Sequence, residues 1–314
     1  MLESFAVRKE FAAVAFVSVL FAVGHSQATI VRFQSSLGNV DVRLYDGATP
    51  LSVANFLGYA NADRYDGSFI HRSPPGFVVQ GGGFVFVPPN FVDPVVDPNN
   101  PDPPVLNEPG ISNQRGTIAM AKLGNNPNSA TSQWFFNLTD NSGPPPALDT
   151  QNGGFTVFGR VILNGMSVVD AIDDLPERDL DGTGGTFDQV PLRGVDSDPL
   201  ADRLVFIESV DVLNFPAGDY DFNGTVNNAD YTVWRSSFGS TTRAEADGNG
   251  NGVVDAADYV LWRKTFGQTS GGGSGSLGPV LAPEPSVMAM LTAAAGLLAT
   301  RRRRNRSSAS FLIP

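Results

Sequence analysis

The chain has 314 residues, including 34 glycines and 23 prolines, and a formal net charge of −11. We expect no nucleic-acid partner, because an acidic body cannot replace the counterions of phosphate groups. The absence of cysteine excludes disulfides, thiolate metal sites and a cysteine nucleophile.

Residues 1–28 have the pattern of a secretory signal peptide. Two basic residues precede the apolar run 11–24, and Ser26 and Ala28 are small residues with the spacing required by signal peptidase. We therefore expect cleavage after Ala28 and export of the protein. The alternative is a core helix of the mature fold.

Residues 29–215 are expected to form a mainly β domain. Period-two alternation over 29–46, interrupted by SSLGN, predicts a β-hairpin. Helical spacing predicts a helix over 49–62, with Thr49 as its N-cap, and a second helix over 164–175. Further strand-like runs are FIHR, GFVVQGGGF, GTIAMAK, QWFFNL, TVFGRV and RLVFIESVDVL. Many strands with two helices favour an antiparallel barrel capped by helices.

Three stretches carry a family resemblance, and they follow the predicted hairpin and helix in order. They are FIHRSPPGFVVQGGGF (69–84), RGTIAMAKLGNNPNSATSQWFFNLTDN (115–141) and FTVFGRVILNGMSVVDAI (155–172). This order resembles the cyclophilin family of peptidyl-prolyl cis-trans isomerases. The resemblance implies a closed eight-stranded antiparallel barrel with a helix at each end and an active groove on the outer face. It also implies proline-containing polypeptide substrates and no cofactor for catalysis.

Rotation about an X-Pro bond has a barrier of about 18–20 kcal/mol, and its catalysis needs no covalent intermediate. A hydrogen bond to the prolyl nitrogen weakens amide resonance, and a permanently charged guanidinium suits that donor role. By resemblance, Arg72 is the donor, Gln80 orients it and Gln133 binds the substrate backbone. Phe77 and Phe135 would form the proline pocket. The resemblance places four further residues along the groove: Val78, Ala121, Leu148 and Phe155.

Each of these residues also has a simpler interpretation. Arg72 alone would be interpreted as a surface salt-bridge residue, and Phe77 and Phe135 as core aromatics. His71 is expected to be structural, because the mechanism needs no general base.

Three positions depart from the pattern of the drug-sensitive eukaryotic members. Lys122 stands where many eukaryotic members have Asn, Ala147 where the drug-sensitive enzymes have Trp, and Phe155 where they have His. These changes affect the shape of the groove more than the role of Arg72. We therefore expect weak cyclosporin binding.

Two insertions interrupt the predicted domain. Residues 87–110 hold eight prolines without periodicity, which predicts an irregular surface loop. The alternative is a segment that shapes or occupies the groove. Residues 177–199 are acidic and glycine-rich, and their DLDGTGG fragment resembles a calcium loop but lacks the later ligands. A solvated loop is expected there.

A repeat with a period of 28 residues fills residues 219–267. In each copy, oxygen-bearing side chains occupy loop positions 1, 3, 5, 9 and 12, and a glycine occupies position 6, as in calcium-binding loops. The candidate ligands are Asp219, Asp221, Asn223, Asn227 and Asp230 in the first copy and Asp247, Asn249, Asn251, Asp255 and Asp258 in the second. The duplicated loop and helix resemble a dockerin domain, which implies calcium binding and a cohesin-like partner. The alternatives are polar turns without metal, or a calcium-stiffened spacer.

The last segments are a glycine-serine linker over 268–282 and a tail over 283–306. The tail holds Pro-Glu-Pro, the apolar run 286–300 and an arginine cluster, and it resembles the PEP-CTERM sorting signal. That resemblance implies a transmembrane helix that anchors the protein transiently, followed by processing by an exosortase-type transpeptidase. The expected location is the cell surface, the periplasm or the extracellular space. A plain tail anchor is the alternative.

The sequence as a whole predicts an exported peptidyl-prolyl isomerase that assists protein folding. The alternative is a non-catalytic surface module that binds through the groove and the dockerin-like repeat. A peptide isomerisation assay distinguishes the two.

Overall fold

The computed structural model describes residues 28–92, 102–182 and 185–270. The predicted sorting signal lies outside these ranges, as does nearly all of the predicted signal peptide. Within the described ranges, no helix is both long and apolar enough to cross a membrane. The apolar run 286–300, for which we predicted a transmembrane helix, falls outside them.

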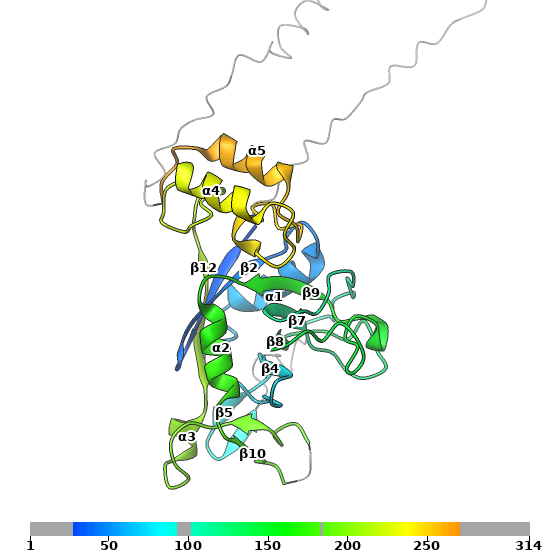
Figure 1. Cartoon of the computed structure of the whole chain (residues 1–314). Coiled ribbons are helices and arrows are strands. Elements are labelled where there is room, and N and C mark those ends of the chain that lie inside the picture. Colours follow the sequence, from blue (N-terminus) through cyan, green and yellow to red (C-terminus); the bar gives the residue numbers. More distant parts are fainter. Residues whose placement is uncertain (1–27, 93–101, 183–184, 271–314) are drawn as a thin grey trace, which may run out of the picture. The chain divides into compact units, whose positions relative to one another are not determined.

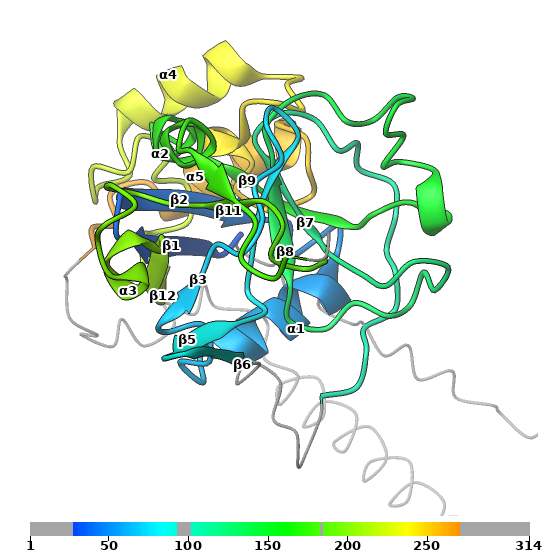
Figure 2. The same ribbon diagram turned by 90° about the horizontal axis from the view of Figure 1, so that it is seen from below.

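One antiparallel sheet organises residues 28–215, which we call the sheet domain. In hydrogen-bonding order its strands are β4 (Val78–Gly81), β8 (Trp134–Asn137), β7 (Thr117–Met120), β9 (Val157–Val161), β2 (Gly38–Leu44), β1 (Ile30–Ser35), β12 (Phe206–Leu213), β3 (Ser68–Phe69), β5 (Val85–Val87) and β6 (Asn90–Val92). The predicted hairpin is β1–β2. The two predicted helices are α1 (Pro50–Ala60) and α2 (Gly165–Asp173), on opposite sides of the strands in Figure 2.

The closed eight-stranded barrel is corrected to a ten-stranded sheet. The two additional strands, β5 and β6, form a hairpin where the proline-rich insertion begins. Its prolines, Pro88 and Pro89, sit at the turn, where no ladder hydrogen bond is needed. Among the described residues, an isolated bridge between Arg72 and Gln80 joins β4 to the segment after β3, in place of a continuous ladder.

An aromatic cluster joins described residues of both insertions to the sheet domain. Phe86 and Phe91 of the hairpin and Phe187 of the second insertion pack with the buried Phe69. The second insertion also contains the paired strands β10 (Glu177–Arg178) and β11 (Val190–Pro191), and α3 (Leu200–Arg203) follows it. Both insertions therefore depart from the irregular loops that we expected, because each contributes phenylalanine side chains to a small apolar core.

Alternation along the strands separates an inner core from the face that carries the groove. In β8, Trp134 and Phe136 belong to the main core, whereas Phe135 between them belongs to a second cluster. Ile118 and Met120 of β7 likewise point into the main core. Because neighbouring side chains of a strand point to opposite faces, one strand serves both the core and the groove.

The N-terminus of α1 is held by a side chain from the first insertion. Thr49 is the N-cap residue but makes no side-chain capping bond. Instead, the carboxylate of Glu108 accepts hydrogen bonds from the backbone N–H groups of Leu51 (3.2 Å) and Ser52 (2.8 Å). These are donors that a helix cannot satisfy internally, so Glu108 takes over the predicted role of Thr49.

The repeat (residues 219–267) forms two helices, α4 (Asn228–Ser237) and α5 (Ala256–Thr265), each directly after one predicted loop. They lie side by side (Figure 1), with a distance of 5.2 Å between the ring centroids of Tyr231 and Trp262. Trp234 of α4 donates to the carbonyl of Asp255, and Trp262 of α5 donates to the carbonyl of Asn227, both at 2.8 Å. Each helix is thus bonded to the loop of the other copy.

The second loop of the repeat packs on the sheet domain. Arg43 of β2 is buried, and its Nη1 donates to the carbonyl of Asp247 at 2.7 Å. The backbone N–H of Gly47 donates to the carbonyl of Gly250 at 3.1 Å. The guanidinium of Arg43 also lies 5.4 Å from the ring centroid of Phe222, so an arginine near the end of β2 is covered by the repeat.

Candidate active site

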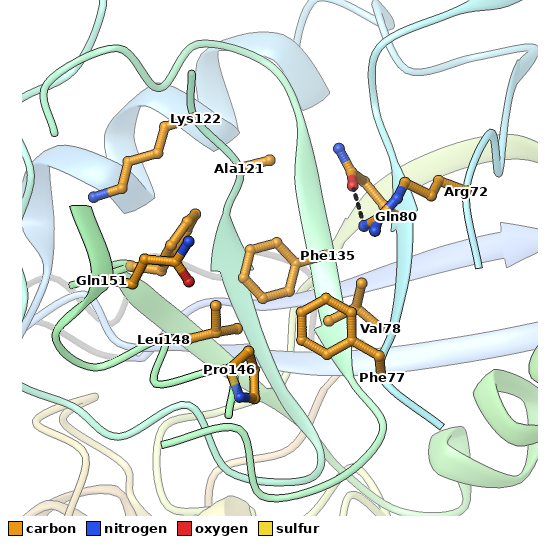
Figure 3. Close-up of a pocket in the computed structure, with 11 residues that line it drawn as sticks. Arg72, Phe77, Val78, Gln80, Ala121, Lys122, Phe135, Pro146, Leu148 and Gln151 are labelled. Atoms are coloured by element: carbon orange, nitrogen blue, oxygen red, sulfur yellow. Dashed lines mark hydrogen bonds between the residues drawn. The ribbon is translucent and has the colours of Figure 1, made fainter. Parts of the chain in front are cut away.

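A pocket of about 390 Å³ opens where the three predicted stretches meet. It is lined by Arg72, Phe77, Val78, Gln80, Ala121, Lys122, Phe135, Pro146, Leu148, Gln151 and Phe155. In Figure 3, Arg72 and Gln80 lie on one side of the Phe135 ring, and Lys122 and Gln151 lie on the other. Eight of the nine groove residues named from the sequence therefore line one pocket, and the ninth is Gln133.

The polar side of the pocket is a chain of three side chains. Arg72 Nη1 donates to Gln80 Oε1 at 3.4 Å, and Gln80 Nε2 donates to Gln133 Oε1 at 3.0 Å. Gln80 is on β4, directly opposite Phe135 of β8, so the strand register sets the polar chain beside the aromatic ring. Gln133 does not itself line the pocket, and it accepts the hydrogen bond from the Gln80 side chain.

Arg72 keeps its charge at the edge of the pocket. Burial lowers the pKa of its guanidinium, and the nearby carboxylate of Asp188 opposes this shift. An arginine remains protonated under all physiological conditions. The guanidinium also lies 5.9 Å from the ring centroid of Phe77, so a fixed cation borders an apolar surface.

The apolar side of the pocket is built on buried rings. Phe135 and Leu148 are each 4% exposed, and Phe77 and Phe155 are partly buried against the same cluster. The rings of Phe135 and Phe155 meet edge to face, with centroids 5.8 Å apart. These packed side chains provide an apolar surface that suits a proline ring.

His71 is buried and cannot act as a base near neutral pH. Burial, together with the neighbouring charge of Arg72, lowers the pKa of His71 to about 3. Its ring packs edge to face on Phe84, with centroids 5.0 Å apart. The structure thus places His71 as a neutral core residue, in line with our expectation.

Sequence reasoning did not place Pro146, Gln151 or Lys122 in the site. Pro146 and Gln151 flank Leu148, and the signal that could have found them is their closeness in sequence to that predicted groove residue. Lys122 was noted only as a departure from the family pattern. None of the described residues of the proline-rich insertion, 87–92 and 102–110, lines the pocket.

A second candidate site lies in the first loop of the repeat. Carboxylate oxygens of Asp219, Asp221 and Asp230 all lie within 4.8 Å of one another. Asp219 accepts from the backbone N–H of Gly224 (2.8 Å), and Asp230 accepts from that of Tyr220 (2.7 Å). Backbone N–H groups of the loop therefore hold the carboxylates of Asp219 and Asp230 toward the centre of the loop.

The second loop repeats this arrangement with the same number of acids, but its third acid is Asp255 at position 9 instead of an aspartate at position 3. Asp247 accepts from the backbone N–H of Gly252 (2.8 Å), and Asp258 accepts from those of Asn249 (3.2 Å) and Asp255 (2.8 Å). Gly252 has a φ of 89°, in the left-handed region that glycine tolerates, as does its counterpart Gly224 with a φ of 86°. The conformation predicted for position 6 is thus present in both loops.

Burial raises the pKa of Asp219, Asp247 and Asp258 in these loops. The pKa is raised to about 6 for Asp219 and Asp247 and to about 7 for Asp258. Neighbouring carboxylates add to the shift at Asp219 and Asp258. Buried carboxylates with this donor set fit a hard divalent cation such as calcium, which would compensate their charge.

Comparisons with known proteins cover the sheet domain. Residues 30–195 match the family described as cyclophilin type peptidyl-prolyl cis-trans isomerase/CLD. A peptidyl-prolyl cis-trans isomerase of Acinetobacter baylyi is 37% identical over 169 residues, which are 53% of this chain and 81% of the relative. Peptidyl-prolyl cis-trans isomerase B of Escherichia coli is 34% identical over 169 residues, 53% of this chain and 94% of the relative.

A solved structure of a cyclophilin type peptidyl-prolyl cis-trans isomerase of Cryptosporidium parvum also matches. The TM-score is 0.43 and the sequence identity 19%, over 60% of this chain and 99% of that chain.

Proposed function

Since the chain belongs to the family of cyclophilin-type peptidyl-prolyl cis-trans isomerases and is an enzyme of that class, we propose that it acts through a hydrogen bond from Arg72 to the prolyl nitrogen of its substrate. Its substrates are proline-containing peptides, and its catalysis needs no cofactor. The observation that carries the proposal is the Arg72–Gln80–Gln133 chain beside the apolar pocket.

The chemistry follows from these two surfaces. As the X-Pro bond twists, resonance is lost and the prolyl nitrogen gains a lone pair that can accept a hydrogen bond. A cation held in place by Gln80 stabilises that state more than the planar ground state, which is the requirement for catalysis. Phe77, Phe135 and Leu148 hold the proline ring while the preceding carbonyl moves.

Substitution of Arg72 tests the mechanism. Arg72→Ala should lower kcat/KM by about 100-fold to 1,000-fold, the range seen when one preorganised donor to a transition state is removed. Arg235→Ala, on the exposed face of α4, makes the same chemical change away from the groove and serves as the control. Full turnover in Arg72→Ala, measured by a protease-coupled peptide assay, would rule out the donor role.

We also propose that the repeat binds calcium in both loops. Support comes from the converging carboxylates of the first loop, the raised pKa values of Asp219 and Asp258, and the glycines at position 6. Bound calcium would neutralise carboxylates that otherwise repel one another. The ligands would be the ten predicted oxygen-bearing residues of the two loops, of which Asp219, Asp221 and Asp230 already converge.

The cellular setting is a further part of the proposal. We propose that the enzyme is exported, that its clients are other exported proteins, and that it is sorted at the membrane and released to or held at the cell surface. The support is the sequence pattern of residues 1–28 and 283–306. Mass spectrometry of the mature protein tests this: an intact signal peptide and arginine cluster would contradict it.

A cohesin-like protein remains our proposed partner for the repeat. The support is apolar surface on and next to α4 and α5, where Phe238, Val260 and Phe266 are exposed. For the groove, Ala147 and Phe155 favour weak cyclosporin binding. A low-nanomolar dissociation constant for cyclosporin would contradict that expectation.

A further inference from the structure

Lys122 sits at the edge of the pocket, with its ammonium surrounded by oxygen atoms of this chain. Nζ donates to the carbonyls of Gly154 (2.6 Å) and Asn152 (2.9 Å) and to Oδ1 of Asn107 (3.3 Å). It also lies 4.7 Å from the ring centroid of Phe155. An ammonium group has three donors, and here three acceptors are within reach, so none is left for a substrate carbonyl.

The acceptors come from an unusual turn. Asn152, Gly153 and Gly154 have φ values of 51°, 77° and 77°, three successive residues in the left-handed region. Asn107 also bonds this turn, because its Nδ2 donates to the carbonyls of Gly153 (2.9 Å) and Gly154 (2.8 Å). Lys122 and Asn107 together therefore fix the backbone that leads directly into Phe155.

Phe155 lines the pocket and connects Lys122 and the turn to the substrate site. Its ring contacts both the Lys122 ammonium, 4.7 Å from the ring centroid, and the Phe135 ring, which it meets at an interplanar angle of 70°. A cation over an aromatic face is attractive, and it strengthens when the cation is partly withdrawn from water. Burial lowers the pKa of Lys122, which agrees with such withdrawal.

We propose that Lys122 is a positioning residue of the proline pocket: it holds the 152–154 turn and the Phe155 ring against Phe135, and it makes no contact with the substrate. This inference rests on the proposed role of the aromatic rings as the proline pocket. Apolar contacts with the proline ring stabilise the bound ground state and the transition state to a similar extent. Their loss should therefore raise KM and leave kcat nearly unchanged, unlike the loss of Arg72.

A double-mutant cycle tests the inference. Lys122→Met keeps the aliphatic stem and removes the charge, and it should lower kcat/KM about fivefold to tenfold, mainly through KM. Phe155→Leu should cause a loss of similar size. If Lys122 acts through the Phe155 ring, the double variant should be no weaker than Phe155→Leu alone.

Two further variants complete the test. Lys264→Met, on the exposed end of α5, is the matched control and should keep the kcat/KM of the parent protein. Lys122→Arg keeps a cation over the ring and should retain most of the activity.

Several results would overturn the inference. They are a parental kcat/KM in Lys122→Met, losses that multiply in the double variant, or a Lys122→Arg as weak as Lys122→Met. These results would leave the proline pocket intact. A parental kcat/KM in Phe155→Leu would instead count against Phe155 as part of the pocket, and the inference about Lys122 would fail with it.

Discussion

The groove and the repeat gather polar groups in opposite ways. In the groove, Arg72, Gln80 and Gln133 form a hydrogen-bonded chain, and the charge of Arg72 lies beside the Phe77 ring. In the repeat, carboxylates of the same sign converge on backbone N–H groups, and burial raises the pKa of Asp219 and Asp258. The first site joins a cation to neutral amides, whereas the second brings together negative charges, which is why we propose a cation for it alone. The two should therefore respond differently to substitution, metal and pH.

The largest expected effect is on the groove. Phe135→Ala removes a ring that is 4% exposed, and it should destabilise the protein by about 3 kcal/mol while abolishing most of the activity. Calcium binding by the repeat should be unchanged, since none of the ten proposed calcium ligands lines the groove pocket. Denaturant unfolding, the peptide assay and calorimetric titration measure the three quantities. Equal loss of calcium binding would contradict the independence of the two sites.

Calcium should have the next largest effect, this time on the repeat. At 100 times its dissociation constant, calcium should stabilise the folded protein by about 2.7 kcal/mol, and a chelator should reverse this. Asp221→Ala, at position 3 of the first loop, should weaken binding without removing a helix cap. Glu208→Ala, which removes an exposed acid of β12 in the sheet domain, is the control. If thermal unfolding and calorimetry show no response to millimolar calcium, the metal proposal fails.

A smaller effect is expected at Gln80. Gln80→Leu keeps the approximate side-chain volume but removes the acceptor that orients Arg72, and it should lower kcat/KM about tenfold, or about 1.4 kcal/mol. Gln80→Glu retains an acceptor for Arg72 and should recover part of the loss. If Gln80→Leu were as active as the parent protein, Arg72 would be held by other contacts.

The smallest expected effect is that of pH on the groove. Arg72 keeps its charge, and the pKa of His71 is about 3, so kcat/KM should be constant between about pH 5.5 and 8. A titration of activity within that range would show that another group takes part.

The repeat should respond to the same pH change. Because their pKa values are raised to about 6 or 7, Asp219, Asp247 and Asp258 bind protons more tightly in the folded state than in the unfolded chain. Without calcium, stability should therefore rise as pH falls from about 7 towards 4, the ordinary pKa of an aspartate. Protons compete with calcium, so the stabilisation by calcium should shrink over the same range. Thermal unfolding with and without calcium checks both directions.

The side of the groove that carries Arg72 could be predicted because its residues are close together in the sequence. Arg72, Phe77 and Gln80 fall within nine residues, and the register of β4 with β8 brings Phe135 to them. The contacts of Lys122 could not be predicted in this way. They depend on the directions of backbone carbonyl groups in the 152–154 turn, where three successive residues have positive φ values. A sequence pattern does not predict these directions.

The outer face of β2 shows a second limit of sequence patterns. Alternation in β2 sets Asp41 and Arg43 on a polar face, where solvent would be expected. Both are buried, because Asp41 pairs with Arg32 (2.7 Å) and Arg43 is covered by the repeat. The alternation correctly predicts a strand, but it cannot predict that the repeat covers the polar face of that strand.

The packing of the second loop on β2 has a consequence for how the two parts of the chain can be separated. A chain ending at residue 215 would leave Arg43 Nη1 without its carbonyl acceptor and would expose the apolar surface under Ala244. A side chain at Gly47 would come within 3.0 Å of the carbonyl oxygen of Asn249, so neither surface can change freely. The repeat is thus not a detachable module: transplanting it, or the sheet domain alone, would require redesign of the surface it leaves behind.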